Sequence, residues 1–251
     1  MFSLRKKKQK NQIIDKGENN NIFLDTLRFK SSTALLNGNG NHVKFSDCDI
    51  NNTCLSVIGD SNKLTFSGSQ LNNSFVNING NNNTIVIGQG SSIACMELVI
   101  NGNNHQLFIG EYVQVTGKLA FWFEDSENQI VIGKYSTFGI TNIAIAEPQT
   151  KILIGDDCMF ANGVSVKNSD FHSIIDIHAN QRINPSANVV IGNHVWLGEQ
   201  CHVLKNVTIH DNSIVALGSI VTKDVPSNCV VAGNPIKVIK ENVTWTRERI
   251  I

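Results

Sequence analysis

Five of the seven histidines lie in the last third of the chain, which also carries Asp170, Asp176 and Arg182. These five are His172, His178, His194, His202 and His210. A neutral imidazole, with a pKa of about 6.5, can remove a proton from a hydroxyl or an amine, which is typically worth about 10²–10⁴-fold in rate. Such a base needs a carboxylate or a backbone carbonyl to orient its ring, and Asp170 and Asp176 are the nearby candidates. The residue types therefore predict proton transfer with a polar substrate.

Metal and nucleotide chemistry have little support in the sequence. A zinc lyase needs three imidazoles that converge on one metal, and the histidines of this region lack such a spacing. The six cysteines form no CxxC pair. There is no GxGxxG or P-loop segment, which excludes a Rossmann or kinase-like phosphate site. We expect no bound metal.

Composition limits the class of protein that must position these residues. Lys+Arg and Asp+Glu are both 21, so no basic excess is present to bind nucleic acid. No apolar run is long enough to span a membrane, and no signal-peptide pattern is present, so we expect a cytoplasmic protein with reduced, mostly buried thiols. The basic start at Lys6, Lys7 and Lys8 predicts a solvated arm or a weak contact with the inner membrane surface.

A repeat of nearly constant period runs through the first two thirds of the chain. Its units are polar–x–apolar–x–apolar–Gly/Ser and begin at Asn41, Asn62, Asn83, His105, Asn128 and Thr150. Alternating apolar residues indicate strands with one face inward, and a fixed spacing indicates a β-solenoid whose coils bury their faces by stacking. The 33 asparagines suit this architecture, because Asn accepts tight turns and can stack into a hydrogen-bonded ladder at one corner.

After residue 188 the apolar residues follow six-residue steps, and Ile191 and Ile209 are separated by three such steps. This spacing predicts a triangular coil with one short strand on each side. Between Ile154 and Ile191 the interval is 37 residues, about one coil plus 15 to 19 extra. A loop that leaves a rigid solenoid is a common place for function, so we predict an active-site loop at 170–187.

Three segments near this loop carry a family resemblance: Asp170-Phe171-His172-Ser173-Ile174, Arg182-Ile183-Asn184 and His194-Val195-Trp196-Leu197-Gly198. Together with V-T-K-D at 221–224 and A-G-N-P at 232–235, they resemble the hexapeptide-repeat acyltransferases. The pattern is most similar to O-acetyltransferases of capsular polysaccharides such as polysialic acid. The likeness covers about residues 154 to 240, and upstream only the repeat character matches. It implies a left-handed parallel β-helix, a homotrimer with active sites between subunits, and acetyl-coenzyme A as co-substrate.

The resemblance also assigns roles. It makes His172 the general base, with Asp170 in the catalytic set, and places Trp196 along the thioester and pantetheine groove. It assigns stabilisation of the oxyanion to a backbone N–H at Gly198 or Glu199. The remaining cofactor contacts fall on the C-terminal coils, where lysines suit phosphates. These contacts are Leu217, Gly218, Thr222, Lys223, Lys237 and Lys240.

Arg182 has two interpretations. It could clamp a substrate carboxylate, with Asp176 beside it in the substrate site, or it could pin the loop to a neighbouring chain. The expected organisation has four parts. These are a basic arm at 1–21, a solenoid at 22–155, a hexapeptide-repeat β-helix at 156–240 that contains the loop 170–187, and a C-terminal tail at 241–251.

The sequence thus predicts an O-acetyltransferase that acts on a surface glycan. N-acetylation of a nucleotide-linked amino sugar is the alternative reaction, because an amine acceptor also needs a base. A non-catalytic β-solenoid scaffold is the alternative from another class. It would explain residues 30–150, but neither the loop nor the V-T-K-D and A-G-N-P segments.

Overall fold

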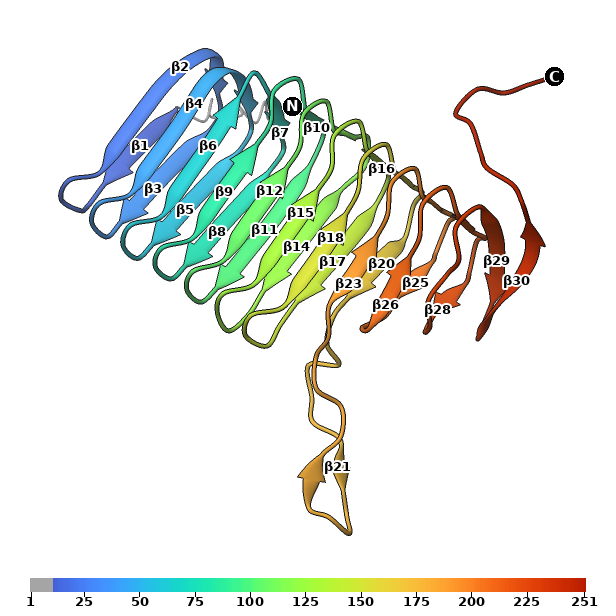
Figure 1. The fold of residues 1–251 in the computed structure, drawn as a ribbon. Coiled ribbons are helices and arrows are strands. Elements are labelled where there is room, and N and C mark those ends of the chain that lie inside the picture. The colour runs from blue at the N-terminus through green and yellow to red at the C-terminus, as the bar shows by residue number, and fades with distance from the viewer. Residues whose placement is uncertain (1–10) are drawn as a thin grey trace, which may run out of the picture.

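The computed structural model describes residues 11–251, and the basic residues Lys6, Lys7 and Lys8 lie outside this range. The regular elements in the described range are all β-strands, wound into stacked coils that form one elongated prism (Figure 1). The predicted β-solenoid is confirmed.

The strands form three stacks along the prism. The first is a ten-stranded parallel sheet, with the strands β1 (Gln12–Asp15), β3 (Thr33–Asn37), β5 (Cys54–Ile58), β8 (Phe75–Asn79), β11 (Met96–Asn101), β14 (Leu119–Phe123), β17 (Thr141–Ile145), β20 (Val164–Lys167), β25 (His202–Val203) and β28 (Ile220–Val221). The second contains β2 (Asn21–Lys30), β4 (His42–Asn51), β6 (Lys63–Ser67), β9 (Thr84–Ile87), β12 (Gln106–Ile109), β15 (Gln129–Ile132), β18 (Lys151–Ile154), β23 (Val189–Ile191) and β26 (Val207–Ile209).

The third stack is joined to the second through the long strands β2 and β4. It contains β7 (Gln70–Asn72), β10 (Ser92–Ile93), β13 (Gln114–Val115), β16 (Thr137–Phe138), β19 (Met159–Phe160), β24 (Trp196–Leu197), β27 (Ile214–Val215) and β29 (Cys229–Gly233), and it is closed by β30 (Ile236–Glu241), which pairs antiparallel with β29. A separate antiparallel pair, β21 (Ile175–Asp176) and β22 (Gln181–Arg182), lies outside the prism.

The register reproduces the predicted periods. In the long coils Gln106 pairs with Gln129, one unit of the repeat further on. In the last coils Val189 pairs with Val207, which lies three six-residue steps further on. Along most strands of the coils buried and more exposed side chains alternate, as in β9 and β12, and the inward side chains form one continuous core.

The asparagine ladder is also confirmed. Asn41, Asn62 and Asn83 are fully buried at the corner that follows the ten-stranded sheet. The side-chain oxygen of Asn41 accepts the backbone N–H of Asn62 (2.9 Å) and its amide (3.0 Å), and Asn62 repeats both contacts with Asn83. Each ladder residue therefore satisfies the corner of the next coil, where buried polar groups would otherwise lack partners.

His105 occupies the next position of this ladder. Its ring is fully buried and its Nδ1 accepts the backbone N–H of Asn128 at 3.3 Å. Within residues 11–251 its Nε2 has no hydrogen-bond partner. Burial lowers the pKa of His105, although the backbone carbonyls of Asn101 and Asp125 partly oppose this effect.

The ends of the chain depart from the expected boundaries. β1 lies within the segment 1–21 that we expected to be an arm, and it pairs in register with β3, so Gln12–Asp15 already belong to the solenoid. The segment 241–251 is not a free tail, because Trp245 in it is only 7% exposed.

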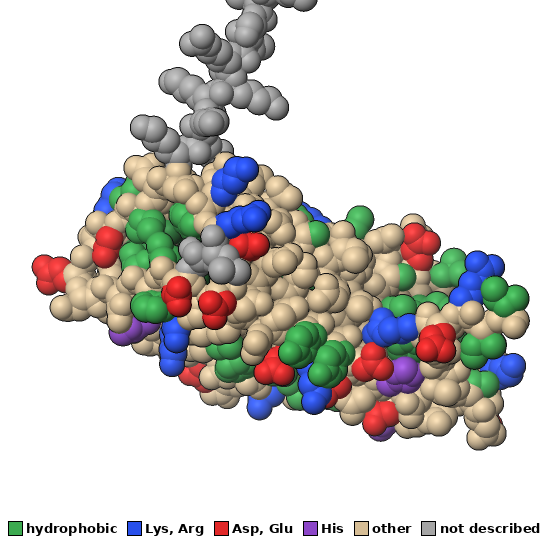
Figure 2. Space-filling model, turned by 90° about the horizontal axis from the view of Figure 1, so that it is seen from above, with side chains coloured by type: hydrophobic (Ala, Val, Ile, Leu, Met, Phe, Trp, Pro, Cys, Tyr) green, Lys and Arg blue, Asp and Glu red, His purple; other side chains and the backbone are tan. Residues whose placement is uncertain are grey.

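The face of the prism seen in Figure 2 carries no dominant charge. On the face shown in Figure 2, acidic and basic side chains are interspersed among uncharged ones. Four of the six free cysteines are buried, while Cys54 is exposed and Cys95 is partly exposed. Residues 11–251 contain no helix of the length and hydrophobicity needed to cross a membrane.

Candidate active site

The predicted loop leaves the prism after β20 and returns before β23, and its middle forms the projecting hairpin β21–β22 (Figure 1). Asp176 caps the turn at the tip, where its Oδ1 accepts the backbone N–H groups of His178 (2.8 Å) and Ala179 (2.9 Å). The N–H groups of Ala179 and His178 hold the pKa of Asp176 below its usual range. Asp176 therefore shapes the hairpin, and these hydrogen bonds do not reach the ring of His172.

Asn184 organises the base of the loop. It is only 7% exposed, and its Oδ1 accepts the backbone N–H of Ile174 at 2.7 Å. Its amide nitrogen donates to the backbone carbonyl of His172 (2.8 Å) and to Oδ2 of Asp170 (2.7 Å). These three bonds join the outgoing and returning strands of the loop and fix the backbone that carries His172.

Asp170 belongs to the same anchor. Lys205, on the following coil, donates to Oδ2 of Asp170 (2.6 Å) and to the backbone carbonyl of Asn184 (3.0 Å). The Lys205 ammonium holds the pKa of Asp170 below its usual range, helped by the amide of Asn184. We predicted Asp170 or Asp176 as the group that orients His172. Within residues 11–251 neither carboxylate bonds the His172 ring: Asp170 binds Asn184 and Lys205 through Oδ2, and Asp176 binds the hairpin turn.

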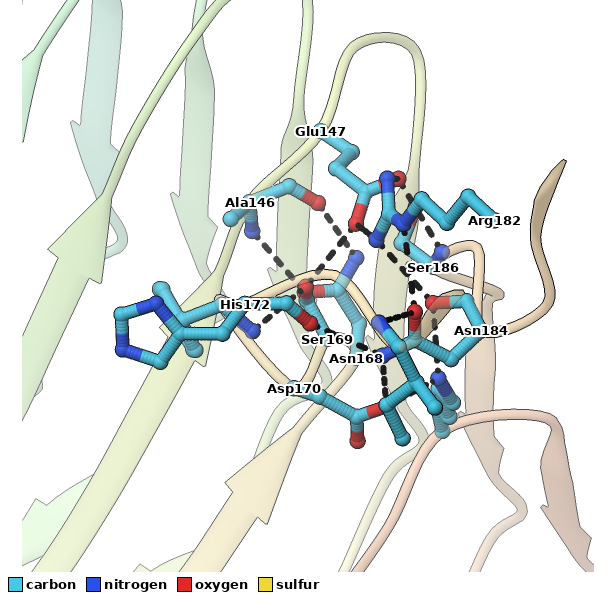
Figure 3. Close-up of polar contacts among 12 residues, drawn as sticks. Ala146, Glu147, Asn168, Ser169, Asp170, His172, Arg182, Asn184 and Ser186 are labelled. Carbon is cyan, nitrogen blue, oxygen red and sulfur yellow. Dashed lines mark hydrogen bonds and ion pairs between the residues drawn. The ribbon is translucent and has the colours of Figure 1, made fainter. Parts of the chain in front are cut away.

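Arg182 pins the loop to the preceding coil of its own chain. Its Nη1 and Nη2 donate to the two carboxylate oxygens of Glu147, at 3.0 Å and 2.5 Å, and its Nε donates to Oδ1 of Asn184 at 3.2 Å (Figure 3). The guanidinium lowers the pKa of Glu147 to about 2, and the N–H of Ser186 and the hydroxyl of Ser169 also lower it. The prediction that Arg182 clamps a substrate carboxylate is therefore corrected. The Arg182 guanidinium already binds the carboxylate of Glu147, which lies in the same chain rather than in a neighbouring one.

His172 is exposed, and its ring points away from the anchor residues (Figure 3). It lies in a groove whose wall also includes Trp122, Glu124, Asp125 and Phe171. Within residues 11–251 no hydrogen bond engages either ring nitrogen. A ring with both nitrogens accessible, on a backbone that is held from both sides, can act as a base toward a ligand in the groove.

Trp196 lies on β24 and is 37% exposed. It borders a second groove, lined mostly by apolar residues. Leu217, which is 77% exposed, belongs to this lining. The other lining residues are Ala161, Gly198, Glu199, Ile214, Val215 and Ala216. Its mostly apolar lining suits a flexible apolar chain laid against the face of the prism.

Gly198 is required at the floor of this groove. A Cβ atom there would lie 2.6 Å from the backbone nitrogen of Leu217 and 2.9 Å from the carbonyl oxygen of Val215. The N–H of Gly198 already donates to that Val215 carbonyl at 2.8 Å, so the prediction that it stabilises an oxyanion is corrected. The N–H of Glu199 has no acceptor within residues 11–251 and remains the candidate.

The other expected cofactor residues lie on the outside of the last coils. Gly218 adopts a left-handed φ of 68° and donates its N–H to the carbonyl of Glu199. Thr222 and Lys223 are exposed just after β28. Lys237 and Lys240 are exposed on β30. Their roles stay predictions.

The C-terminal segment folds back beside Trp196. Trp245 stacks on His194, with ring centroids 4.2 Å apart, and its centroid is 6.1 Å from that of Trp196. Nδ1 of His194 lies 2.7 Å from Oδ2 of Asp157, and Arg247 donates to Oδ1 of the same carboxylate at 2.9 Å. Burial raises the pKa of Asp157, but the hydrogen bonds from His194 and Arg247 outweigh this effect and leave it lowered.

The two grooves lie apart on the prism. His172 follows the ten-stranded sheet, whereas Trp196 lies on β24 in the third stack, and no residue lines both grooves. One chain therefore does not bring the two predicted residues together. In the part of the chain that the structure describes, no three His, Cys, Asp or Glu side chains gather in a metal-binding cluster.

Sequence reasoning missed Glu147, Lys205 and Trp122. Glu147 had a signal in the repeat, because it lies one coil before Ser169 and one coil after Asp125, and it contacts both. Extending the repeat backwards from the loop would have found it. Lys205 and Trp122 had no comparable signal.

A comparison with protein families matches residues 188–223 to the model described as bacterial transferase hexapeptide (six repeats). Two curated proteins, both named polysialic acid O-acetyltransferase, are each 38% identical to this chain. That from Escherichia coli O1:K1 / APEC matches over 120 residues, 48% of this chain and 39% of that protein. That from Neisseria meningitidis matches over 124 residues, 49% of this chain and 57% of that protein. The chain thus spans only part of the length of these relatives.

A solved structure agrees over a greater length. The crystal structure of the polysialic acid O-acetyltransferase OatWY superposes with a TM-score of 0.68 at 31% sequence identity. The superposition covers 96% of this chain and 93% of that one, so the likeness extends through the long coils and the C-terminal repeats alike.

Proposed function

The chain belongs to the hexapeptide-repeat acetyltransferases, a family of left-handed parallel β-helices, and on this basis we propose that it transfers an acetyl group from acetyl-coenzyme A to a hydroxyl group of a surface glycan. The observation that carries the proposal is the end-to-end likeness to OatWY, whose name states O-acetyl transfer. The loop that presents His172 supplies the chemical support.

Transfer to a hydroxyl needs a base that removes its proton while the oxygen attacks the thioester carbonyl. In the proposed step the imidazole of His172 takes that proton, the ester C–O bond forms, and the C–S bond breaks. The protonated ring then returns its proton to the leaving sulfur. The hydrogen bond from Asn184 to the His172 carbonyl holds the backbone of the base in place during both transfers.

The groove at Trp196 would hold the acetyl donor. Its apolar lining by Ala161, Trp196 and Leu217 suits the pantetheine chain, and the N–H of Glu199 is available to the carbonyl oxygen as negative charge develops there. The exposed Lys223, with Lys237 and Lys240, would meet the phosphates.

Assembly follows from the separation of the two grooves. Because His172 and Trp196 lie apart in one chain, the proposed reaction needs two chains, with His172 from one prism facing Trp196 of the next. A homotrimer closes such a head-to-tail contact into a ring, with one site at each interface.

The test compares two histidines of the same loop. His172→Ala should abolish acetyl transfer to a panel of polysaccharides that includes polysialic acid, while sedimentation shows an unchanged assembly. His178→Ala is the matched control, because His178 is also exposed on the loop but contributes only its backbone to the Asp176 turn. Activity retained in His172→Ala would overturn the assignment of the base.

A further inference from the structure

The groove beside His172 has one aromatic wall. We call it the acidic groove and define it by the aromatic and titratable residues of its lining, which are Trp122, Glu124, Asp125, Glu147, Phe171, His172 and Arg182. Trp122 is 44% exposed on β14, and its register neighbours on β11 and β17 are Val99 and Ala144. Because these neighbours are smaller than the indole, Trp122 stands out from the sheet as an accessible apolar platform close to the candidate base.

The platform is held in one orientation. The indole Nε1 of Trp122 donates to Oε1 of Glu124 at 2.8 Å, and the side-chain amide of Asn101 donates to the same oxygen at 3.1 Å. A surface tryptophan that only covered the core would not need its ring fixed from outside. A fixed and exposed indole can receive the apolar C–H face of a pyranose ring without a further ordering cost.

The charge of the acidic groove is one-sided. Three carboxylates line it, those of Glu124, Asp125 and Glu147, against the single guanidinium of Arg182. Arg182 is committed to Glu147, whose two oxygens are filled by Arg182, Ser169 and Ser186. Lys205, which anchors the loop, is likewise committed to Asp170. The exposed Lys167 on β20 lies in register with Ala144, the neighbour of Trp122, but it is outside the lining of the groove.

Free acceptor atoms remain on the other two carboxylates. Asp125 uses Oδ2 to accept the backbone N–H of Glu147 at 2.8 Å, and Glu124 uses Oε1 for Trp122 and Asn101. Within residues 11–251 no hydrogen bond engages Oδ1 of Asp125 or Oε2 of Glu124. These oxygens can accept hydroxyl or ammonium protons, but they would repel a carboxylate that is bound beside them.

We propose that the acidic groove is the acceptor subsite of the acetyl transfer and that it selects a pyranose without a carboxylate, either neutral or amine-bearing, stacked on Trp122. The inference rests on the proposed function and narrows its substrate class. It departs from the acceptor named for the relatives, because polysialic acid carries a carboxylate on every sugar. An ammonium group would gain from both the indole face and the free carboxylate oxygens.

The experiment measures acetyl transfer by the full chain to three tetrasaccharides at saturating acetyl-coenzyme A. These are maltotetraose, fully deacetylated chitotetraose and an α2,8-linked sialic acid tetramer. We expect kcat/KM to be at least about tenfold higher for one of the first two than for the sialic acid tetramer. Trp122→Ala should raise KM for that preferred acceptor by about tenfold or more and leave KM for acetyl-coenzyme A unchanged.

Phe75→Ala is the matched control. Phe75 is also 44% exposed and also points outward from the ten-stranded sheet, but it lies on β8 and does not line the acidic groove. Its replacement should leave both KM values unchanged. Equal effects of Phe75→Ala and Trp122→Ala would mean that general stability, not acceptor binding, is being measured, and would overturn the assignment of Trp122.

Binding without acetyl donor separates this inference from the proposed function. Saturation-transfer NMR should detect maltotetraose or chitotetraose on the wild type and not on Trp122→Ala. Binding of this kind without any acetyl transfer would sustain the groove as a site for a pyranose without a carboxylate and overturn the proposed reaction. Efficient transfer to the sialic acid tetramer, insensitive to Trp122→Ala, would sustain the reaction and overturn the subsite. Failure of both neutral and amine-bearing tetramers to bind would also overturn the subsite.

Discussion

Replacement of Glu147 by glutamine tests whether the loop is held by charge. Glu147 accepts four hydrogen bonds, two from Arg182 and one each from Ser186 and Ser169. Glu147→Gln keeps the size of the side chain but removes its charge and replaces one acceptor oxygen by a donor that faces another donor. We expect the loop 170–187 to detach more often while the coils stay intact.

The magnitude follows from the pKa of Glu147. Its fall from the ordinary 4.5 to about 2 corresponds to roughly 3 kcal/mol, since one pH unit is worth about 1.4 kcal/mol. The side chains of Glu147 and Arg182 are 24% and 34% exposed, so screening by water reduces this upper value to about 1–2 kcal/mol. Loop opening should therefore increase by about 5–30-fold.

The pH dependence has a defined sign. A carboxylate whose pKa is lowered by folding stabilises the folded loop above its ordinary pKa of 4.5 and loses this contribution as the pH falls toward about 2. The wild-type loop should thus stay anchored at pH 5 and detach progressively below 4.5. In Glu147→Gln this acid-dependent step should be smaller, and the part that remains should come from Asp170, whose pKa is lowered by Lys205.

Amide hydrogen exchange is the measurement, read on peptides from 170–187. At pH 7 these peptides should exchange about 5–30-fold faster in Glu147→Gln, with peptides of the coils unchanged. Glu127→Gln is the control, because Glu127 is an exposed carboxylate near the same corner that bonds Gln149 and not the loop. Unchanged loop exchange in Glu147→Gln, or an equal increase in Glu127→Gln, would refute the reasoning.

Three further outcomes test the site and the solenoid. His172→Ala and Trp196→Ala should each be inactive, but trimers mixed from equal amounts should recover about a quarter of wild-type activity in an acetyl-transfer assay. About three quarters of randomly assembled rings contain both variants, and each such ring has one intact interface of three. A site within one chain would recover no activity. Gly198→Ala should lower the unfolding free energy by about 1–3 kcal/mol in denaturant titrations, since its Cβ meets backbone on the next coil. The pKa of His105 is lowered in the folded chain, so below pH 6.5 the unfolded chain binds a proton that the folded chain does not, and the free energy of unfolding should fall. Melting temperatures measured between about pH 7.5 and 5.5 should show this decline in the wild type and a flatter one in His105→Asn.

The coils were predictable because their determinants are local. Alternation of apolar side chains selects the inward face of each strand, and Asn41, Asn62 and Asn83 recur at the position where a corner needs internal hydrogen bonds. The break in spacing located the loop for the same reason. Its hairpin projects from the prism and cannot satisfy the repeat.

The partners of polar side chains were less predictable. Residue type suggested that Arg182 would bind a carboxylate, and it does, but only the stacking of coils determines that the carboxylate is Glu147. Asp170 likewise meets Lys205 because the next coil passes beside the loop. Trp122 reaches the neighbourhood of His172 from far earlier in the chain through two strand pairings, which no local pattern specifies.

The split between the two grooves explains why the loop is anchored so thoroughly. A general base must stay within hydrogen-bond distance of the proton that it removes, and here the second half of the site belongs to a different chain in the proposed trimer. A freely moving loop would spread His172 over many positions and lose that alignment. The ion pair of Glu147 and Arg182 and the buried amide of Asn184 remove this freedom at the base of the loop, while the exposed ring keeps access to the acceptor. The rigid prism thereby fixes the position of His172, although His172 lies on the loop outside it. Glu147→Gln, which is remote from the reacting atoms, should therefore lower kcat more than it changes KM for either substrate.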